Sequence, residues 1–141
     1  MKYLVYGALV FAGLIHLLPL SGVLGSAQLA SLYGLHFDEP NVSILMRHRA
    51  VLFGLIGSFM LWSIFRPSLR SAAFLGGMIS VASFILLALT ADAYNAQIRR
   101  VVLVDAAVLL CLFVGTIAHF SMLSSREPHF RLSAWRRPGK T

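Results

Sequence analysis

Four long apolar runs constrain the fold of this chain more than any other feature of its sequence. They cover residues 3–20, 44–65, 71–91 and 101–121, and an α-helix needs about 20 such residues to cross the hydrocarbon of a bilayer. Lipid offers backbone groups no hydrogen-bond partner, so each spanning segment must satisfy its own, as helices do. The alternating ten-residue segments of a β-barrel are not visible. We therefore predict an all-α integral membrane protein whose residues 1–123 form a bundle of four transmembrane helices.

The composition agrees with a membrane location and excludes a soluble globule. Of the 141 residues, 58% are hydrophobic and 12% are charged, against about a quarter charged in a typical soluble domain. A net charge of +7 would suggest nucleic acid in a soluble protein. Here most basic residues flank the apolar runs, where orientation signals and anionic lipid head groups use them. We expect no nucleic-acid partner.

The distribution of Lys and Arg favours an orientation with both termini in the cytoplasm. The segments on the same side as the N-terminus carry Lys2, then Arg66 and Arg70 in a short turn, and then five basic residues in the tail. The arginines on the opposite side have acidic residues close to them, so the positive excess lies inside. Residues 124–141 are predicted to form a basic cytoplasmic tail that adsorbs to an anionic leaflet or docks a partner.

The connection between the first two runs, residues 21–43, is long for a four-helix bundle and half apolar. We predict that it contains a short helix lying at the outer membrane interface and ending near Gly34, before an acidic turn that Pro40 closes. Asn41 or Ser43 is the predicted N-cap of the second spanning helix.

Ionisable residues within the spans gather in the outer half of the predicted bundle. A charge in hydrocarbon costs at least about 2.5 kcal/mol, so each such residue needs a partner and is a candidate for function. Arg47, His48 and Arg49 are consecutive on the second helix. A rotation of about 100° per residue points them in three directions, so at least one turns inward. In the alternative, both arginines extend to head-group phosphates.

Asp105 lies roughly 7.5 Å deeper along the fourth helix than Arg100, with apolar neighbours on both sides in the sequence. A carboxylate in that position must be protonated, paired or hydrated. Helical phase turns the adjacent arginines away, so we expect its partner on another helix, among Arg47, His48 and Arg49. Such a pair either fixes the packing alone or belongs to a ligand-binding or proton-handling site.

Other polar residues extend this candidate site. Asp92, Asn95 and Arg99 fall at i, i+3 and i+7, on one stripe of a helix, although a polar outer turn explains them equally well. His16 is either a satisfied core residue or a member of the same cavity. Arginine forks bind phosphate, sulfate or carboxylate, so the expected ligand is a lipid or an amphipathic anion. The predicted ligand-binding residues are Arg47, His48, Arg49, Asp105, His16, Asp92, Asn95 and Arg99.

We expect no cofactor and no metal. Neither HxxxH nor HExxH spacing occurs in the sequence, and arginines beside the candidate ligands would repel a cation. Walker loops and GxGxxG turns are also absent from the sequence. The single cysteine, Cys111, excludes an intrachain disulfide and a cysteine-rich metal site.

The segment GLIHLLPLSGVLG, followed by LYGL, DEPN and LMRHRAVLFGLIG, resembles a group of small four-helix bacterial membrane proteins of unknown function. The group is DoxX-like in size and layout and is distinguished by its RHRAVLFG block. The resemblance covers residues 1–121. Members often carry the label phosphopantetheine adenylyltransferase, but that enzyme is a soluble α/β protein with an HxGH motif, which this chain lacks. The resemblance implies a location in the bacterial inner membrane and a role for Arg47, His48 and Arg49, and it implies no activity.

Three functions are compatible with these features. The favoured one is a non-catalytic or accessory membrane protein whose outer-leaflet polar pocket binds a lipid or amphipathic anion. The first alternative is a small membrane enzyme acting on a lipid-soluble substrate, with His48 or Asp105 as general acid or base and a cavity of about 300 Å³ or more. The second is a small proton-coupled transporter that uses Asp105. Membrane lipids are the expected partners, together with a second copy of the chain or another membrane subunit.

Overall fold

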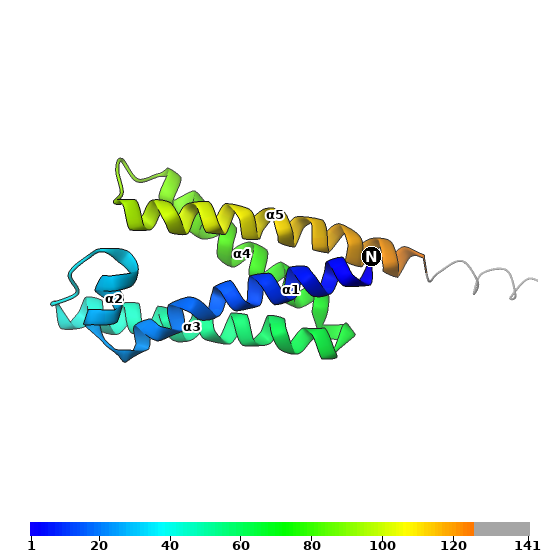
Figure 1. Ribbon diagram of the computed structural model, residues 1–141, viewed down its shortest axis with the longest axis horizontal. Coiled ribbons are helices and arrows are strands. Elements are labelled where there is room, and N and C mark those ends of the chain that lie inside the picture. Colours follow the sequence, from blue (N-terminus) through cyan, green and yellow to red (C-terminus); the bar gives the residue numbers. More distant parts are fainter. Residues whose placement is uncertain (126–141) are drawn as a thin grey trace, which may run out of the picture.

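The structure, a computed structural model, describes residues 1–125, and that part of the chain contains helices and turns but no strand (Figure 1). The α-helices are α1 (Lys2–Leu17), α2 (Ser26–Tyr33), α3 (Pro40–Phe65), α4 (Arg70–Leu89) and α5 (Ala96–Ser124), and the 3-10 helices η1 (Leu18–Leu24) and η2 (Pro67–Leu69) extend α1 and precede α4.

Four helical segments are long and apolar enough to cross a membrane, which confirms the predicted all-α fold with four helices of spanning length and composition. They are Lys2–Leu24, Pro40–Phe65, Pro67–Leu89 and Ala96–Ser124. Most of the predicted tail lies outside the described residues.

Two of the spanning helices begin earlier than their apolar runs, because polar residues cap them. The side chain of Glu39 accepts hydrogen bonds from the backbone N–H groups of Asn41 (3.0 Å) and Val42 (2.7 Å), which lowers the pKa of this carboxyl group. The predicted cap at Asn41 or Ser43 is therefore wrong: Glu39 caps α3, and Pro40 fits the first helical position, where no N–H is needed. Similarly, Asn95 caps α5 by accepting from the N–H of Ile98 at 2.8 Å.

The short helix predicted between the first two spans is present as α2. It ends at Tyr33, where Gly34 adopts the left-handed conformation with φ of 65°, a common helix terminator because glycine has no Cβ to strain. Its position at the membrane interface stays a prediction.

The four long helices form a ring in which α1 packs against α3 and α5, and α4 packs against α5 and less closely against α3. Diagonal contacts are few between α1 and α4, and α3 and α5 do not meet. At one end of the bundle the elements spread apart, with the start of α5 above and α2 with the start of α3 below (left in Figure 1). Diagonal helices that do not touch leave room for a cavity where the ring widens.

The tight part of the bundle depends on two glycines where α1 crosses α3. A Cβ atom placed on Gly57 would lie 2.7 Å from the backbone oxygen of Gly13, and one placed on Gly13 would lie 3.1 Å from the oxygen of Gly57. Backbone atoms cannot move aside as a side chain can. Small residues thus allow the two helices to approach closely, the usual basis of helix association in lipid.

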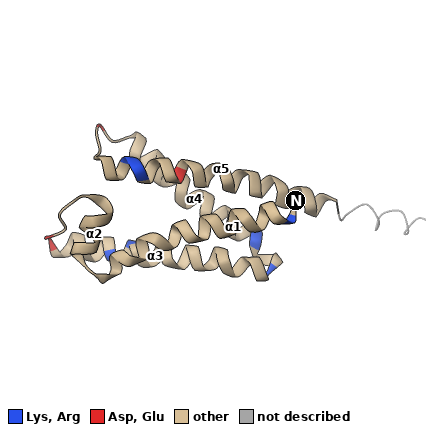
Figure 2. Ribbon diagram, in the orientation of Figure 1, with Lys and Arg blue, Asp and Glu red and all other residues tan. Residues whose placement is uncertain are grey.

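Charged residues lie toward the two ends of the bundle, with an uncharged stretch between them (Figure 2). At the end of the bundle opposite the spread end, Arg70 is buried and donates to the carbonyl oxygens of Ile64 (2.8 Å) and Ser63 (3.3 Å). These carbonyls belong to the last turn of α3, where the regular helical donors run out, and the Ser63 oxygen also accepts from the backbone N–H of Arg66 at 3.2 Å. Arg70 therefore caps α3, and its guanidinium also lies 4.9 Å from the ring centre of Tyr6.

We predict that Gly57→Ala lowers the free energy of unfolding in detergent by about 1–3 kcal/mol, the usual penalty for overpacking. The matched control is Gly7→Ala, since a Cβ on Gly7 meets nothing within 4 Å and alanine favours a helix by up to about 1 kcal/mol. Equilibrium unfolding followed by circular dichroism measures both. Equal stability of the two variants would contradict a close α1–α3 crossing.

Candidate functional site

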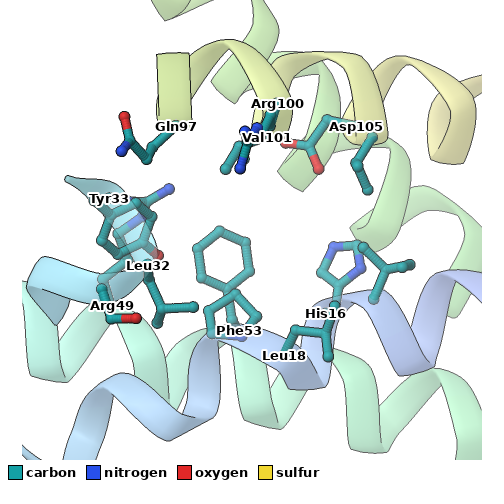
Figure 3. Close-up of a pocket in the computed structure, with 14 residues that line it drawn as sticks. His16, Leu18, Leu32, Tyr33, Arg49, Phe53, Gln97, Arg100, Val101 and Asp105 are labelled. Carbon is teal, nitrogen blue, oxygen red and sulfur yellow. The ribbon is translucent and has the colours of Figure 1, made fainter. Parts of the chain in front are cut away.

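The spread end of the bundle contains a cavity of about 250 Å³ between α1, η1, α2, α3 and α5 (Figure 3). Most of its wall is apolar. His16, Arg49 and Phe53 line it on the side of α1 and α3, and Gln97, Arg100 and Asp105 line it on the side of α5. The polar residues of the wall are His16, Ser31, Tyr33, Arg49, Gln97, Arg100 and Asp105.

Arg49 is the residue of the Arg47–Arg49 triplet that turns inward. Its guanidinium carbon lies 5.4 Å from the ring centre of Tyr33, 4.9 Å from that of Phe53 and 5.2 Å from that of Phe84. These rings come from α2, α3 and α4, so the cation sits in an aromatic cage built by three helices. Cation–π contacts of this kind contribute about 0.5–2 kcal/mol each, more when desolvated.

Aromatic rings leave the N–H donors of Arg49 without acceptors. Within residues 1–125 its side chain makes no hydrogen bond to another residue, and no fully buried side-chain nitrogen or oxygen lacks a partner. The donors of Arg49 must therefore reach open space, and Arg49 lines the cavity. A caged cation with unmatched donors is a suitable contact for an anion or another strong acceptor.

Asp105 faces the same cavity from α5 and is half-buried. It interacts with Arg49 electrostatically through space, but no ion pair or hydrogen bond joins the two side chains among the described residues. The structure thus places Asp105 across the cavity from Arg49, one of its three expected partners, without direct contact between the two side chains. The separation leaves space between a cation and an anion for water or a ligand.

His16 is both a satisfied core residue and part of the cavity wall. It is 3% exposed, and its Nδ1 lies 2.8 Å from the carbonyl oxygen of Ala12. A carbonyl only accepts, so Nδ1 carries a proton and donates it. Its Nε2 lies 3.3 Å from the hydroxyl of Ser80 on α4. His16 therefore links α1 to α4 below the cavity.

Tyr33 presents a phenol group at the cavity from α2. Burial raises the pKa of its hydroxyl, and the negative charge of Asp105 acts in the same direction, while Arg49 lowers this pKa by a smaller amount than burial raises it. The hydroxyl therefore stays protonated at neutral pH and is a neutral donor beside the charged Arg49.

Asn95 holds α2 in place over the cavity. Its side-chain nitrogen donates to the carbonyl oxygens of Tyr33 (2.8 Å) and Gly34 (3.4 Å), while its side-chain oxygen caps α5. A small apolar cluster of Leu29, Tyr33 and Phe37 also holds α2 in place, because Met46 of α3 and Ile98 of α5 pack against it. Asn95 thus positions a cavity wall without lining the cavity itself.

The other predicted site residues lie away from the cavity. The side chain of Arg47 is exposed and donates to the carbonyl oxygen of Val23 at 3.0 Å, which ties α3 to η1. His48, Asp92 and Arg99 are exposed and do not line the cavity. His119 is at the opposite end, bonded to Ser71 at 3.0 Å.

Sequence reasoning missed Tyr33, Phe53, Phe84 and Gln97 as site residues, and helical phase turned Arg100 away from Asp105. Arg100 lines the cavity. The aromatic residues carry no local signal, because apolar rings are frequent throughout the membrane segments. No group of three or more His, Cys, Asp or Glu side chains able to hold a metal occurs in the described part of the chain.

Comparison with known proteins gives no match for this chain, either to a protein-family model or to a curated protein or solved structure.

We predict that two substitutions of Asn95 separate its two roles. Asn95→Asp keeps an oxygen that caps α5 but loses the donor to Tyr33, so only α2 should exchange its amide hydrogens faster. Asn95→Ala loses both, so the first turn of α5 should also exchange faster, as expected for a cap that contributes about 0.5–2 kcal/mol. Hydrogen–deuterium exchange measures both segments. Unchanged exchange in α2 for both variants would contradict the clamp.

Proposed function

We propose that this protein is a non-catalytic or accessory membrane protein that binds a lipid or another amphipathic anion in the cavity between α2, α3 and α5. The anionic group contacts the guanidinium of Arg49, with Arg100 and the hydroxyl of Tyr33 as additional donors on the cavity wall.

The observation that carries this proposal is the environment of Arg49. Three aromatic rings surround its guanidinium. They attract the positive charge but offer no conventional hydrogen-bond acceptor to its N–H groups. In a spanning helix an arginine without acceptors is costly. A carboxylate or phosphate supplies these acceptors in the fork geometry that arginine prefers.

The charge of the cavity wall supports an anion of low charge. The wall holds two arginines and one aspartate, which leaves one formal positive charge when His16 is neutral. Asp105 disfavours a multiply charged group, and it accepts a hydrogen bond from any hydroxyl or amine that the ligand carries. A singly charged amphiphile with a small head group suits both the charge and the cavity volume of about 250 Å³.

The proposal includes a location and an orientation. Lys2, Arg66 and Arg70 lie at the end of the bundle where α5 stops, and the tail sequence after α5 carries five more basic residues, whereas the cavity end carries four arginines, at positions 47, 49, 99 and 100. The positive-inside rule then puts both termini in the cytoplasm and the cavity in the outer leaflet. The membrane is then the bacterial inner membrane that the resemblance implies, and α2 lies at its outer interface.

The function is tested with hexadecanoate, a single-chain carboxylate, and with the uncharged hexadecanol of equal chain length. We predict that Arg49→Met weakens hexadecanoate binding at least about tenfold, because hydrogen bonds to a charged group contribute about 1.5–3 kcal/mol. Native mass spectrometry of the protein in one detergent measures the bound fraction.

Arg99→Met is the matched control, since it removes one positive charge at the same end of the bundle from a residue outside the cavity. It should change hexadecanoate binding less than about threefold, the effect of a screened surface charge. Hexadecanol should bind alike to both variants. If Arg49→Met and the original protein bind hexadecanoate equally, the proposed function is wrong.

The orientation is tested by cysteine labelling in a Cys111→Ala background. We predict that a membrane-impermeant maleimide labels Asp38→Cys in intact cells and labels Ser68→Cys only after lysis, because the two exposed loops lie on opposite sides of the membrane. If only Ser68→Cys is labelled in intact cells, the proposed orientation is wrong and the protein has the opposite one.

A further inference from the structure

A second and larger cavity, of about 580 Å³, lies between α3 and α4 on the other side of Arg49. Its α4 wall is formed by residues 76, 79, 80, 83, 84, 87 and 88, which follow i, i+3, i+4 spacing and share one helical face. Its α3 wall includes Arg49, Leu52, Phe53 and Ile56, again one face. The cavity is therefore a groove along two facing helical stripes, and we refer to it as the α3–α4 groove.

The α3–α4 groove ends beside a tight contact between the two helices and is long enough for a hydrocarbon chain. Met60 is fully buried, and its terminal methyl group occupies the position of a Cβ on Gly77, so α3 and α4 pack tightly there. Gly76 lies beside this contact on the groove wall, and a Cβ on it would meet nothing within 4 Å. From Gly76 to Ala88 the groove extends about 18 Å along α4, slightly more than half of the roughly 30 Å hydrocarbon thickness.

The wall of the groove is apolar in effect, although it includes two serines. Ser80 is bonded to Nε2 of His16 at 3.3 Å, and Ser83 donates to the carbonyl oxygen of Ser80 at 3.0 Å. Both hydroxyls are thus engaged within the protein. The charged group of the groove wall is Arg49, near the outer end where Tyr94 also lies.

Arg49 and Phe53 line both the cavity and the α3–α4 groove. An amphiphile held at Arg49 by its anionic end therefore has beside that end the apolar part of the groove from Phe84, whose ring centre lies 5.2 Å from the guanidinium, to Gly76, about 12 Å along α4. Several residues of the groove wall, including Leu52, Ile79 and Leu87, are exposed on the bundle surface, so a chain can enter sideways from the bilayer.

We propose that the α3–α4 groove binds the single hydrocarbon chain of a lipid whose anionic group is held at Arg49, and that Gly76 sets the longest chain that fits. This inference rests on the proposed function and adds the class of ligand: a long-chain monoanion. A chain bound along both stripes gives up contacts with other lipids, so its affinity depends on how completely its length fills the groove.

The test measures binding of carboxylates of 8 to 16 carbons by native mass spectrometry in one detergent. In Gly76→Leu the new side chain fills the inner end of the groove. We expect it to weaken hexadecanoate binding about fivefold, because the part of the chain beyond the new side chain loses its atom contacts with the groove wall, and to leave octanoate binding within about twofold. Gly7→Leu is the matched control, because Gly7 also has open space around it but lies on α1 outside the groove.

Ile79→Phe provides a second variant, about one helical turn closer to Arg49 on the same stripe and still inward of Phe84. It should shorten the longest well-bound chain further than Gly76→Leu does, so the cut-off in chain length follows the height of the blocking residue. Each variant is first compared with the original protein by size-exclusion chromatography and circular dichroism to establish that it is folded.

Two results would overturn the inference. If both blocking variants bind all chain lengths as the original protein does, the groove holds only exchanging bilayer lipid. If they weaken octanoate and hexadecanoate equally, the effect lies at the anionic end and not along the chain. In both cases the proposed function still holds if Arg49→Met weakens hexadecanoate binding. If instead the blocking variants shift the chain-length cut-off but Arg49→Met does not weaken binding, the proposed function is wrong.

Discussion

The close crossing of α1 and α3 at Gly13 and Gly57 determines where this bundle is tight and where it is open. Because two backbones meet there, α1 stays wedged between α3 and α5, and these two diagonal helices remain apart. The pairs of helices then diverge toward the end at which α3 and α5 begin. A bundle that packed evenly along its whole length would have no cavity. The polar residues of α3 and α5 are thus presented to open space by an apolar contact several turns away.

The open end places a cation in an unusual electrostatic position. Arg49 is stabilised by three aromatic rings and not by a carboxylate in contact, although Asp105 faces it across the cavity. Direct pairing would neutralise the site and close it. Cation–π contacts hold the guanidinium without using up its donors, so the side chain is positioned and still available to a ligand. At the opposite end of the bundle Arg70 has a different role, because its guanidinium donates hydrogen bonds to the carbonyl oxygens at the end of α3.

Several predictions from the sequence concern local chemistry, and all of these except the cap of α3 agree with the structure. Four apolar runs predicted four spanning helices, since lipid leaves a chain no other way to satisfy its backbone, and Gly34 marked the end of α2. The cap of α3 was misplaced because Glu39 is an uncommon N-cap residue. Among the candidate site residues, three consecutive positions of α3 were equally plausible. Helical phase shows that Arg47, His48 and Arg49 diverge, but only the neighbouring helices show which of them turns toward an interior.

The sequence by itself determined that this chain forms four helices long and apolar enough to cross a membrane and that its charged residues lie toward the ends of the bundle, because both properties depend on composition and order along the chain. Only the tertiary structure decided that Arg49 is the caged residue, that Asp105 faces it without contact, and that Tyr33, Phe53 and Phe84 surround it. These rings come from three separate helices. Their convergence depends on crossing angles and helix rotation, which apolar residues on all sides of a membrane helix leave unspecified.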